Sequence, residues 1–389
     1  MACDRTTSAC REKGDDRRCI SARRKKLGFG IILVADFKNK SRQQLKFLCF
    51  GAGAIGSYIG CSLLRCGQKV TFLEQPSAAS LLQQNGLRLR IGADLITFPE
   101  VEVASTLEKA LTYGPYDLGI LAVKSYDTKP LAESLRPYHA ALPPIISFQN
   151  GVENEMILEE ILGPNKVIPA TVTTAIGRNQ AGDVFIERKR GIGIASDHYL
   201  IPALMEVLRC AELNPCIYPD AVSMKWSKMI TNLLANASSA ILNLTPGQIF
   251  ADRRLYHIEV LQIKETLAVM RALNISVTNL PATPVKLLCA CMSKLPEVVS
   301  RPILARSVGK GRGEKMPSFH IDLYQGRTKS EVEFLNGAVV RYAKRCGIKT
   351  PVNQYLTETL MKLTTKEIQL EMYAHNPVLF LREIGERLS

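Results

Sequence analysis

The stretch LKFLCFGAGAIGSYIGCSLLRCGQKVTFLEQ, residues 45–75, decides the fold of this chain. An apolar run leads into Gly51, Gly53 and Gly56, which form the pattern G-x-G-x-x-G, and a helical pattern and a second apolar run follow. In a strand–turn–helix unit the first glycine permits the tight turn, the second lets the backbone approach a pyrophosphate, and the third lets the helix pack closely on the strand. The free N–H groups at the start of the helix then face the phosphates. The pattern predicts a dinucleotide-binding turn, with a simple packing turn as the alternative.

Glu74 closes the second apolar run, 23 residues after Gly51. An acidic residue at this position accepts hydrogen bonds from the ribose hydroxyls of adenosine, and its charge repels a 2′-phosphate. The next residue, Gln75, is neutral, so this end of the site favours NADH over NADPH. Ala54 and Ile55, at the start of the helix, complete the expected cofactor contacts. The alternative is that the Glu74 side chain points to solvent.

The size and composition of the chain fit a two-domain globular protein. It has 389 residues, of which 46% are hydrophobic and 22% charged, and these shares are ordinary for a chain with an apolar core. No stretch approaches the roughly 20 consecutive apolar residues of a membrane-spanning helix. We therefore expect a cytoplasmic protein without a membrane partner.

The positive charge of the chain is concentrated at its N-terminus. The formal net charge is +14, and residues 1–46 hold 13 Lys or Arg against five Asp or Glu. A basic tail of this kind could contact nucleic acid or an acidic surface, but a disordered, solvated extension over residues 1–44 is the expected state. Its acidic residues fit poorly with an organellar transit peptide. Nucleic-acid binding is therefore not expected, and organellar targeting stays an alternative.

Cysteine and histidine usage gives no sign of a disulfide framework or a metal site. The chain has 11 Cys, an odd and scattered number, and Cys289 and Cys291 lack the second pair of a zinc finger. Free thiols of this kind are typical of a reducing compartment. His320 is one of five His without ligand-like spacing, so we expect a structural role for it and no bound metal.

Short apolar runs alternate with helical patterns in the first half of the chain, as in a parallel sheet with helical crossovers. The expected strands are 45–50, 69–74, 117–123, 144–148 and 166–171, with helices at, for example, 54–66 and 152–162. Residues 181–195 have the pattern of a hairpin-like edge. This half is predicted to be a Rossmann-like dinucleotide-binding domain over residues 45–217.

The second half has the 3.6-residue periodicity of helices and almost no strand signal. The expected helices are 221–243, 254–273, 283–294, 331–346 and 353–372. Residues 307–318 are rich in Gly and Lys and are expected to form a loop. After a boundary near 214–221, the chain thus continues as a helical substrate and catalytic domain over residues 218–365 and a C-terminal extension over residues 366–389.

Three polar residues recur at helical spacing on one predicted helix. Lys228, Asn232 and Asn236 are four residues apart, so they share one face of a helix rich in Met, Ile and Leu. A partly desolvated Lys has a lowered pKa and can donate a proton to a carbonyl oxygen. The alternative is a solvated face with a Lys whose apolar stem covers the helix. The neighbouring Lys225 is expected to be exposed.

Five stretches in this order make the sequence similar to the ketopantoate reductase (2-dehydropantoate 2-reductase) family. They are FGAGAIGSYIG (50–60), LAVKSYDT (121–128), FQNGVENE (148–155), KWSKMITNLLAN (225–236) and SEVEFLNG (330–337), and the resemblance covers residues 45–365. It implies an α/β Rossmann-like domain with a parallel sheet, an all-helical C-terminal domain like that of 6-phosphogluconate dehydrogenase, and an active site between them. The implied reaction is transfer of a hydride from NADPH to C2 of 2-dehydropantoate, which gives pantoate for pantothenate and coenzyme A biosynthesis.

The resemblance also implies roles for individual residues. Lys228 would donate the proton, Asn232 and Asn236 would hold the substrate, Glu331 would accept a hydrogen bond from the substrate hydroxyl, and Ser318 would contact the substrate carboxylate. From the residues alone, Glu331 is an acid in a first helical turn, where the helix dipole favours it. Ser318, which follows a Pro, would equally suit a helix N-cap.

By the same resemblance, Lys124 and Asn150 line the nicotinamide end of the cofactor site. Each follows a predicted strand, and the carboxyl ends of strands face the ligand crevice in such sheets. The alternatives are a surface Lys and a turn residue beside Gly151. The family has a basic residue where this chain has Gln75, so the cofactor is NADPH by resemblance and NADH by the residues at this position.

Two other functions stay open at this point. A reductase on the same scaffold could act on another 2-oxo or 3-oxo acid, and a protein of a different class could sense a dinucleotide without catalysis. Lys228 and Glu331 are both present, which favours an enzyme. The sequence is also compatible with a homodimer.

Overall fold

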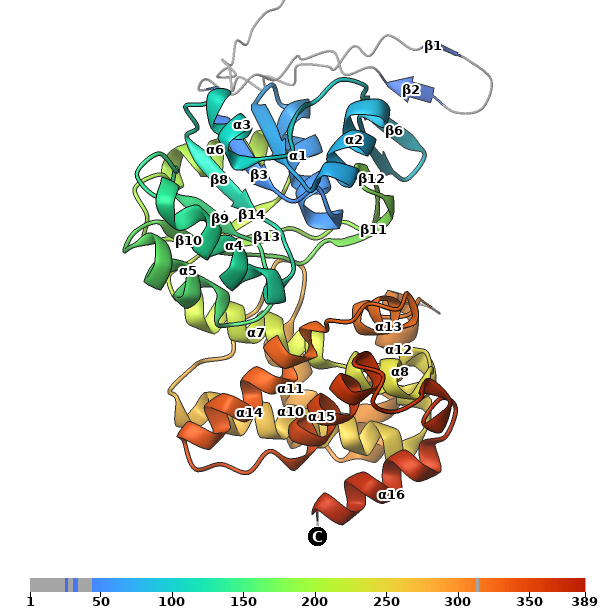
Figure 1. Ribbon diagram of the computed structural model, residues 1–389. Coiled ribbons are helices and arrows are strands. Elements are labelled where there is room, and N and C mark those ends of the chain that lie inside the picture. The colour runs from blue at the N-terminus through green and yellow to red at the C-terminus, as the bar shows by residue number, and fades with distance from the viewer. Residues whose placement is uncertain (1–24, 27–30, 34–43, 313–314, 389) are drawn as a thin grey trace, which may run out of the picture.

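The computed structural model describes residues 25–26, 31–33, 44–312 and 315–388. They form two lobes, an α/β lobe at the top of Figure 1 and a helical lobe below it. Most of the expected disordered extension over residues 1–44 lies outside the described residues. Its described part includes two short strands, β1 (Lys25–Lys26) and β2 (Ile31–Leu33), and the disorder of the extension stays a prediction. Within the described ranges, no helix is long and apolar enough to cross a membrane.

The α/β lobe is built on an eight-stranded sheet. Its strands are β3 (Lys46–Phe50), β4 (Lys69–Leu73), β7 (Glu102–Ala104), β8 (Leu118–Leu121), β9 (Ile145–Ser147), β10 (Val167–Val172), β13 (Ile192–Ala195) and β14 (Pro215–Tyr218). Their order is β14-β13-β10-β9-β8-β3-β4-β7, and all neighbours pair in parallel except β10 and β13. The predicted parallel sheet and its five predicted strands are confirmed.

A second, smaller sheet packs beside the first. It combines β1 and β2 with β5 (Leu87–Ile91), β6 (Asp94–Phe98), β11 (Ala175–Gln180) and β12 (Asp183–Arg188), in the order β1-β2-β6-β5-β12-β11. The hairpin predicted at 181–195 is only partly right, because β12 pairs back with β11 while residues 192–195 join the main sheet. At Gly191 the chain passes so close to Asn214 that an added Cβ would lie 2.5 Å from its backbone oxygen. Directly after Gly191 the chain enters β13 of the main sheet.

Helices cover both faces of the main sheet. They are α1 (Ala54–Arg65), α2 (Pro76–Asn85), α3 (Leu107–Thr112), α4 (Thr128–Leu135), α5 (Asn154–Leu162) and α6 (Ile201–Cys210), with the 3-10 turns η1 (Ser125–Asp127) and η2 (Arg136–Tyr138). One apolar core joins α1, α2, α6 and the second sheet to one face, and another joins α3, α4 and α5 to the opposite face. Alternate residues of β3 enter the two cores, as a strand buried on both faces requires.

The helical lobe confirms the predicted all-helical second half. Its elements are α7 (Ala221–Leu233), α8 (Ala237–Leu242), α9 (Pro246–Ala251), α10 (Arg253–Ala272), α11 (Val285–Lys294), α12 (Glu297–Arg312), α13 (Ser318–Tyr324), η3 (Glu331–Phe334), α14 (Asn336–Arg345), α15 (Pro351–Thr364), η4 (Leu370–Met372) and α16 (Pro377–Leu388). The loop predicted at 307–318 is wrong for residues 307–312, because α12 continues through them to Arg312. A glycine inside a helix costs only about 1 kcal/mol, so glycines alone are a weak signal for a loop.

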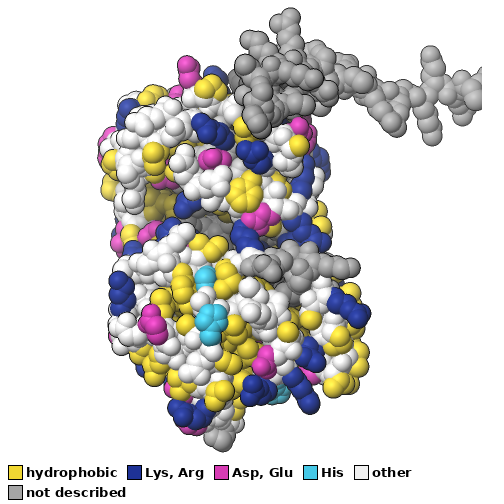
Figure 2. All heavy atoms as spheres, turned by 90° about the vertical axis from the view of Figure 1, so that its right-hand side faces the viewer, with side chains coloured by type: hydrophobic (Ala, Val, Ile, Leu, Met, Phe, Trp, Pro, Cys, Tyr) yellow, Lys and Arg dark blue, Asp and Glu magenta, His cyan; other side chains and the backbone are white. Residues whose placement is uncertain are grey.

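The last helix of the chain packs into the core of the helical lobe. Phe380 of α16 is fully buried and its ring lies edge-on to Tyr355 of α15, with centroids 5.5 Å apart. Ile384 is buried in the same core. The two lobes meet at a waist, and several Lys and Arg side chains lie along it on the face shown in Figure 2.

Candidate active site

The glycine turn has the geometry that its sequence predicts. Gly51 has a φ of 95°, in the left-handed region that favours glycine. A Cβ added to Gly56 would lie 1.9 Å from the backbone oxygen of Gly51, so only a glycine there lets α1 start this close to β3. The first turn of α1 holds no acidic side chain, and no side chain caps its N-terminus. No side chain of the helix itself therefore occupies its free N–H groups, which suits the diphosphate of a dinucleotide.

Glu74 lies against this turn and does not point to solvent. Its half-buried carboxylate accepts hydrogen bonds from the backbone N–H of Ala52, between the first two glycines, and from that of Gln75 at 3.1 Å. Ala54 and Ile55 form the first two positions of α1. The residues predicted to hold a dinucleotide thus lie together at the carboxyl ends of β3 and β4, where ligands bind in sheets of this kind.

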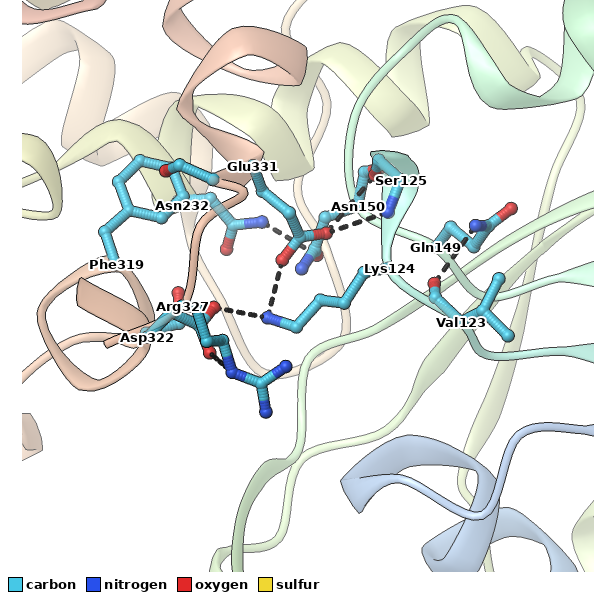
Figure 3. Close-up of polar contacts among 12 residues, drawn as sticks. Val123, Lys124, Ser125, Gln149, Asn150, Asn232, Phe319, Asp322, Arg327 and Glu331 are labelled. Atoms are coloured by element: carbon cyan, nitrogen blue, oxygen red, sulfur yellow. Dashed lines mark hydrogen bonds and ion pairs between the residues drawn. The ribbon is translucent and has the colours of Figure 1, made fainter. Parts of the chain in front are cut away.

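A chain of hydrogen bonds crosses from the α/β lobe to the helical lobe. Asn150, which follows β9, accepts through its Oδ1 a hydrogen bond from Nδ2 of Asn232 on α7 at 2.9 Å (Figure 3). Asn232 in turn accepts, through its own Oδ1, a hydrogen bond from Nζ of Lys228 at 3.0 Å. The side chain of Lys228 is half-buried one helical turn before Asn232. These contacts place three predicted site residues in one polar row.

Lys124 and Glu331 form a second contact between the lobes. Nζ of Lys124 lies 2.9 Å from Glu331 and 2.8 Å from Asp322, whose carboxylates come from η3 and α13 (Figure 3). Burial lowers the pKa of Lys124, but the charges of Glu331 and Asp322 outweigh this effect and raise the pKa above its usual value. Lys124 is therefore a fixed cation of the site, and its surface alternative is wrong.

Glu331 is held on its other oxygen by the α/β lobe as well. The backbone N–H of Ser125 donates to Oε1 of Glu331 at 3.4 Å, and the Ser125 hydroxyl lies 3.2 Å from the same oxygen. That hydroxyl also lies 2.7 Å from the backbone oxygen of Asn150. Glu331 is only 4% exposed, so its partners, rather than a helix dipole, account for its position.

The structure corrects the prediction that Asn236 shares a helix with Lys228. Helix α7 ends at Leu233, and Ala235 has a φ of 49° before α8 begins. Glu259 of α10 stabilises the break by accepting a hydrogen bond from the backbone N–H of Ala235 at 2.7 Å. Asn236 still reaches the row, because its Nδ2 donates to the backbone oxygen of Asn232 at 3.0 Å.

Ser318 joins the site through Asn236. The Ser318 hydroxyl lies 3.5 Å from Nδ2 of Asn236, and Oδ1 of Asn236 accepts the backbone N–H of Phe319 at 3.1 Å. Ser318 is the first residue of α13 and Pro317 holds the cap position. The alternative of Ser318 as a helix N-cap is therefore wrong, and Oδ1 of Asn236 accepts a free N–H at the start of this helix instead.

Lys225 is buried, which contradicts the prediction that it is exposed. It is 5% exposed, and its Nζ pairs with Glu155 at 2.7 Å and donates to the backbone oxygens of Gln149 at 2.6 Å and Ala170 at 3.2 Å. Position 225 precedes Lys228 by three residues, so it lies on an adjoining face of α7. That face packs against the ends of β9 and β10 and therefore anchors α7 on the sheet.

Three site residues were missed by the sequence analysis. Ser125 binds Glu331, and Asp322 pairs with Lys124. Arg327 pairs with Asp322 through its Nε at 3.0 Å. Asp322 follows Ser318 by four residues, so helical spacing could have placed it on the same face of α13. Ser125 directly follows Lys124, but its part depends on Glu331, 206 residues away, and no local pattern shows this.

His320 has a structural environment, as predicted. Its ring stacks on Tyr324 with centroids 4.1 Å apart and lies 2.7 Å from Oδ1 of Asn243. Burial lowers its pKa, which keeps the ring neutral. In the described part of the chain, no group of three or more His, Cys, Asp or Glu is arranged to hold a metal ion.

Comparisons with known proteins agree with this geometry. Residues 47–196 match the family described as Ketopantoate reductase PanE/ApbA, and residues 220–364 match its C-terminal part. The 2-dehydropantoate 2-reductase of Pyrococcus horikoshii is 24% identical over 325 residues, which cover 82% of this chain and 97% of the relative. The enzyme of the same name from Archaeoglobus fulgidus is 27% identical over 79% of this chain and 93% of its own length.

Solved structures show the same fold. A PanE/ApbA family ketopantoate reductase from Ralstonia eutropha JMP134 superposes with a TM-score of 0.70 at 25% identity, over 83% of this chain and 99% of its own. A D-mandelate dehydrogenase solved with NADH and anilino(oxo)acetate has a TM-score of 0.67 at 18% identity, over the same shares of both chains, and supports the fold alone. The matched segments span most of the chain and include both lobes. This chain therefore belongs to the ketopantoate reductase family.

Proposed function

We propose that this chain reduces 2-dehydropantoate to pantoate, with NADH or NADPH as the hydride donor. The observation that carries the proposal is the hydrogen-bonded row from Asn150 through Asn232 to Lys228, which continues from the strand ends of one lobe into the helical lobe. Relatives from several organisms, matched over nearly their full length, bear the name of this enzyme. Pantoate formation would serve pantothenate and coenzyme A biosynthesis.

The cofactor would be held by the glycine turn and by Glu74, Lys124 and Asn150. When bound, the nicotinamide supplies the hydride for the ketone carbon. Gly53 would leave room for the diphosphate on a turn that Gly51 and Gly56 make possible, and the N–H groups of Ala54 and Ile55 would face it. Lys124 carries its positive charge at the contact between the lobes, where Glu331 and Asp322 hold it in place.

Lys228 is proposed as the general acid. Its ammonium group would donate the proton that the ketone oxygen requires as the hydride arrives. Asn232 would orient this ammonium group by accepting a hydrogen bond from it. Asn232 and Asn236 would hold the substrate, and Ser318 would donate to its carboxylate. A carboxylate oxygen can accept more than one hydrogen bond, so Glu331 keeps capacity for the substrate hydroxyl beside its contacts with Lys124 and Ser125.

Between the two cofactors, NADH is the proposed preference. The Glu74 carboxylate lies at the glycine turn, where the adenosine ribose would follow the diphosphate, and Gln75 offers no positive charge to a 2′-phosphate. A carboxylate can accept both ribose hydroxyls of NADH, whereas the phosphate of NADPH would meet a like charge.

Steady-state reduction of 2-dehydropantoate with NADH and NADPH side by side tests the proposal. We expect turnover with at least one cofactor and a higher kcat/KM with NADH. A panel of other 2-oxo and 3-oxo acids serves as the comparison. Faster turnover of one of these acids would select the rival reductase on the same scaffold, and dinucleotide binding without turnover of any acid would select a non-catalytic sensor.

The remaining assignments are proposals of the same kind. The division into a dinucleotide-binding domain over residues 45–217 and a helical domain over residues 218–365 follows the matched family segments closely, and we propose to include residues 366–389 in the helical domain because Phe380 is part of its core. A homodimer and a cytoplasmic location also stay proposals, which sedimentation and cell fractionation would test.

A further inference from the structure

Arg178 lies on β11, at the end of the second sheet, and its side chain starts from the face that packs on α1. Arg178 pairs directly with Val184 of β12, and Val184 pairs with Leu89 of β5. Residues opposite each other on neighbouring strands project to the same face of a sheet. Val184 and Leu89 are buried in the core that includes α1, so Arg178 projects toward this helix as well. In Figure 1, β11 lies at the lower right of the α/β lobe.

The guanidinium group of Arg178 reaches the glycine turn. Among the residues that the structure describes, apart from those next to Gly53 in the chain, only Arg178 would come within 4 Å of a Cβ added to Gly53, with its Nη1 at 3.9 Å. As far as the described ranges show, this positive group is thus what faces the space in front of the second glycine. Since the first turn of α1 holds no acidic side chain, two positive sources face the same space, the helix N-terminus and Arg178.

Arg178 has no partner of its own among the residues that the structure describes. Its side chain is exposed, and no described residue forms a hydrogen bond or ion pair with it. The nearest acid of the turn, Glu74, is engaged with the backbone N–H groups of Ala52 and Gln75. The guanidinium therefore keeps its five N–H donors for a ligand, and its planar fork suits two phosphate oxygens at once.

We propose that Arg178 binds the diphosphate of the dinucleotide from the side of the second sheet, opposite the N-terminus of α1. The inference rests on the proposed use of a dinucleotide, but not on the identity of the oxo acid. Both NADH and NADPH carry the diphosphate, so Arg178 contributes equally to both. A contact with the 2′-phosphate would instead serve NADPH alone.

Binding of each dinucleotide without substrate, followed by the fluorescence of the reduced nicotinamide, tests the proposal. We expect Arg178→Ala to weaken NADH and NADPH alike by about 10- to 100-fold, the usual worth of hydrogen bonds to a charged group. Arg178→Lys should recover part of the loss, since it keeps the charge but not the fork. Arg90→Ala is the matched control, because Arg90 is exposed on the same sheet and pairs with Phe185, which places it on the opposite face.

Competition by fragments identifies the group that Arg178 contacts. ADP should compete less well against Arg178→Ala than against the unchanged chain, while adenosine, which has no phosphate, should compete equally. A loss below threefold for both dinucleotides, or a loss confined to NADPH, overturns the proposal. If the unchanged chain binds both dinucleotides and reduces no oxo acid, the proposed function fails while the assignment of Arg178 stands.

Discussion

The two ends of the candidate active site are built in different ways. The glycine turn is made of backbone from a single segment, residues 45–75, and its shape depends on what a Cβ would strike. The other end is made of side chains that the chain supplies between Lys124 and Glu331, and it exists only while the two lobes are docked. The shape of the first end thus depends on local sterics, and that of the second on packing between the lobes. Mutations at the two ends should therefore have different effects.

The largest effect is expected at the end built between the lobes, from loss of the proposed acid. Lys228→Ala should lower kcat by about 10²- to 10⁴-fold, the usual contribution of a general acid. The affinity for the dinucleotide should stay within a few-fold, because Lys228 lies on α7 of the helical lobe, where its Nζ donates to Asn232. Steady-state kinetics and a separate binding titration measure the two quantities.

Lys264 offers a control for this variant, since it is exposed on α10. Lys264→Ala should leave kcat near that of the unchanged chain. Near-normal turnover in Lys228→Ala itself would remove Lys228 from the acid role and leave the polar row without its proposed chemistry.

The next largest effect is expected on stability, from loss of Lys225, which anchors α7 on the sheet. Lys225→Met removes a buried cation that pairs with Glu155 and donates to two backbone oxygens. Breaking a buried ion pair by removing one partner costs about 3–5 kcal/mol, because the other charge stays buried and unpaired. Urea unfolding should show this loss in the free energy of unfolding.

The exposed Lys286 of α11 provides the matched substitution. Lys286→Met should change the free energy of unfolding by less than about 0.5 kcal/mol, as is usual for surface positions. If the two variants were equally stable, the burial of Lys225 against the sheet would be contradicted.

The glycine turn could be predicted from the sequence, whereas most of the contacts between the lobes could not. The spacing of Gly51, Gly53 and Gly56 between apolar runs predicts the turn, because each requirement is local. Glu331 came from a family resemblance, since an acid in a first helical turn has no distinctive pattern. Ser125 was missed because its partner Glu331 lies 206 residues away, whereas Asp322 was missed although its spacing from Ser318 would have placed it on the same face of α13. Helical periodicity placed Lys228 and Asn232 together but did not show the break at Ala235 or the buried side of α7.

A smaller effect is expected at the glycine turn. Gly56→Ala adds a Cβ that would lie 1.9 Å from the backbone oxygen of Gly51, so the helix start must shift. Overpacking of this kind costs about 1–3 kcal/mol, and the shifted turn should lose affinity for both dinucleotides. Gly385→Ala is the control, because nothing lies within 4 Å of its added Cβ on α16. Equal affinity in the two variants would show that the turn is not a binding element.

The smallest effect should distinguish the two cofactors at the outer part of the same end. Glu74→Gln removes the negative charge beside Ala52 but keeps the size of the side chain. Like charges about 4 Å apart repel by about 1 kcal/mol even at the dielectric constant of water, so kcat/KM with NADPH should rise by several-fold relative to NADH. Gln75→Arg should shift the ratio in the same direction by adding a positive charge at an exposed position. Because neither change touches Lys228 or Asn232, kcat with saturating cofactor should stay constant. A ratio that does not move in either variant would mean that the adenosine ribose lies away from Glu74, and that the carboxylate serves only to hold the turn.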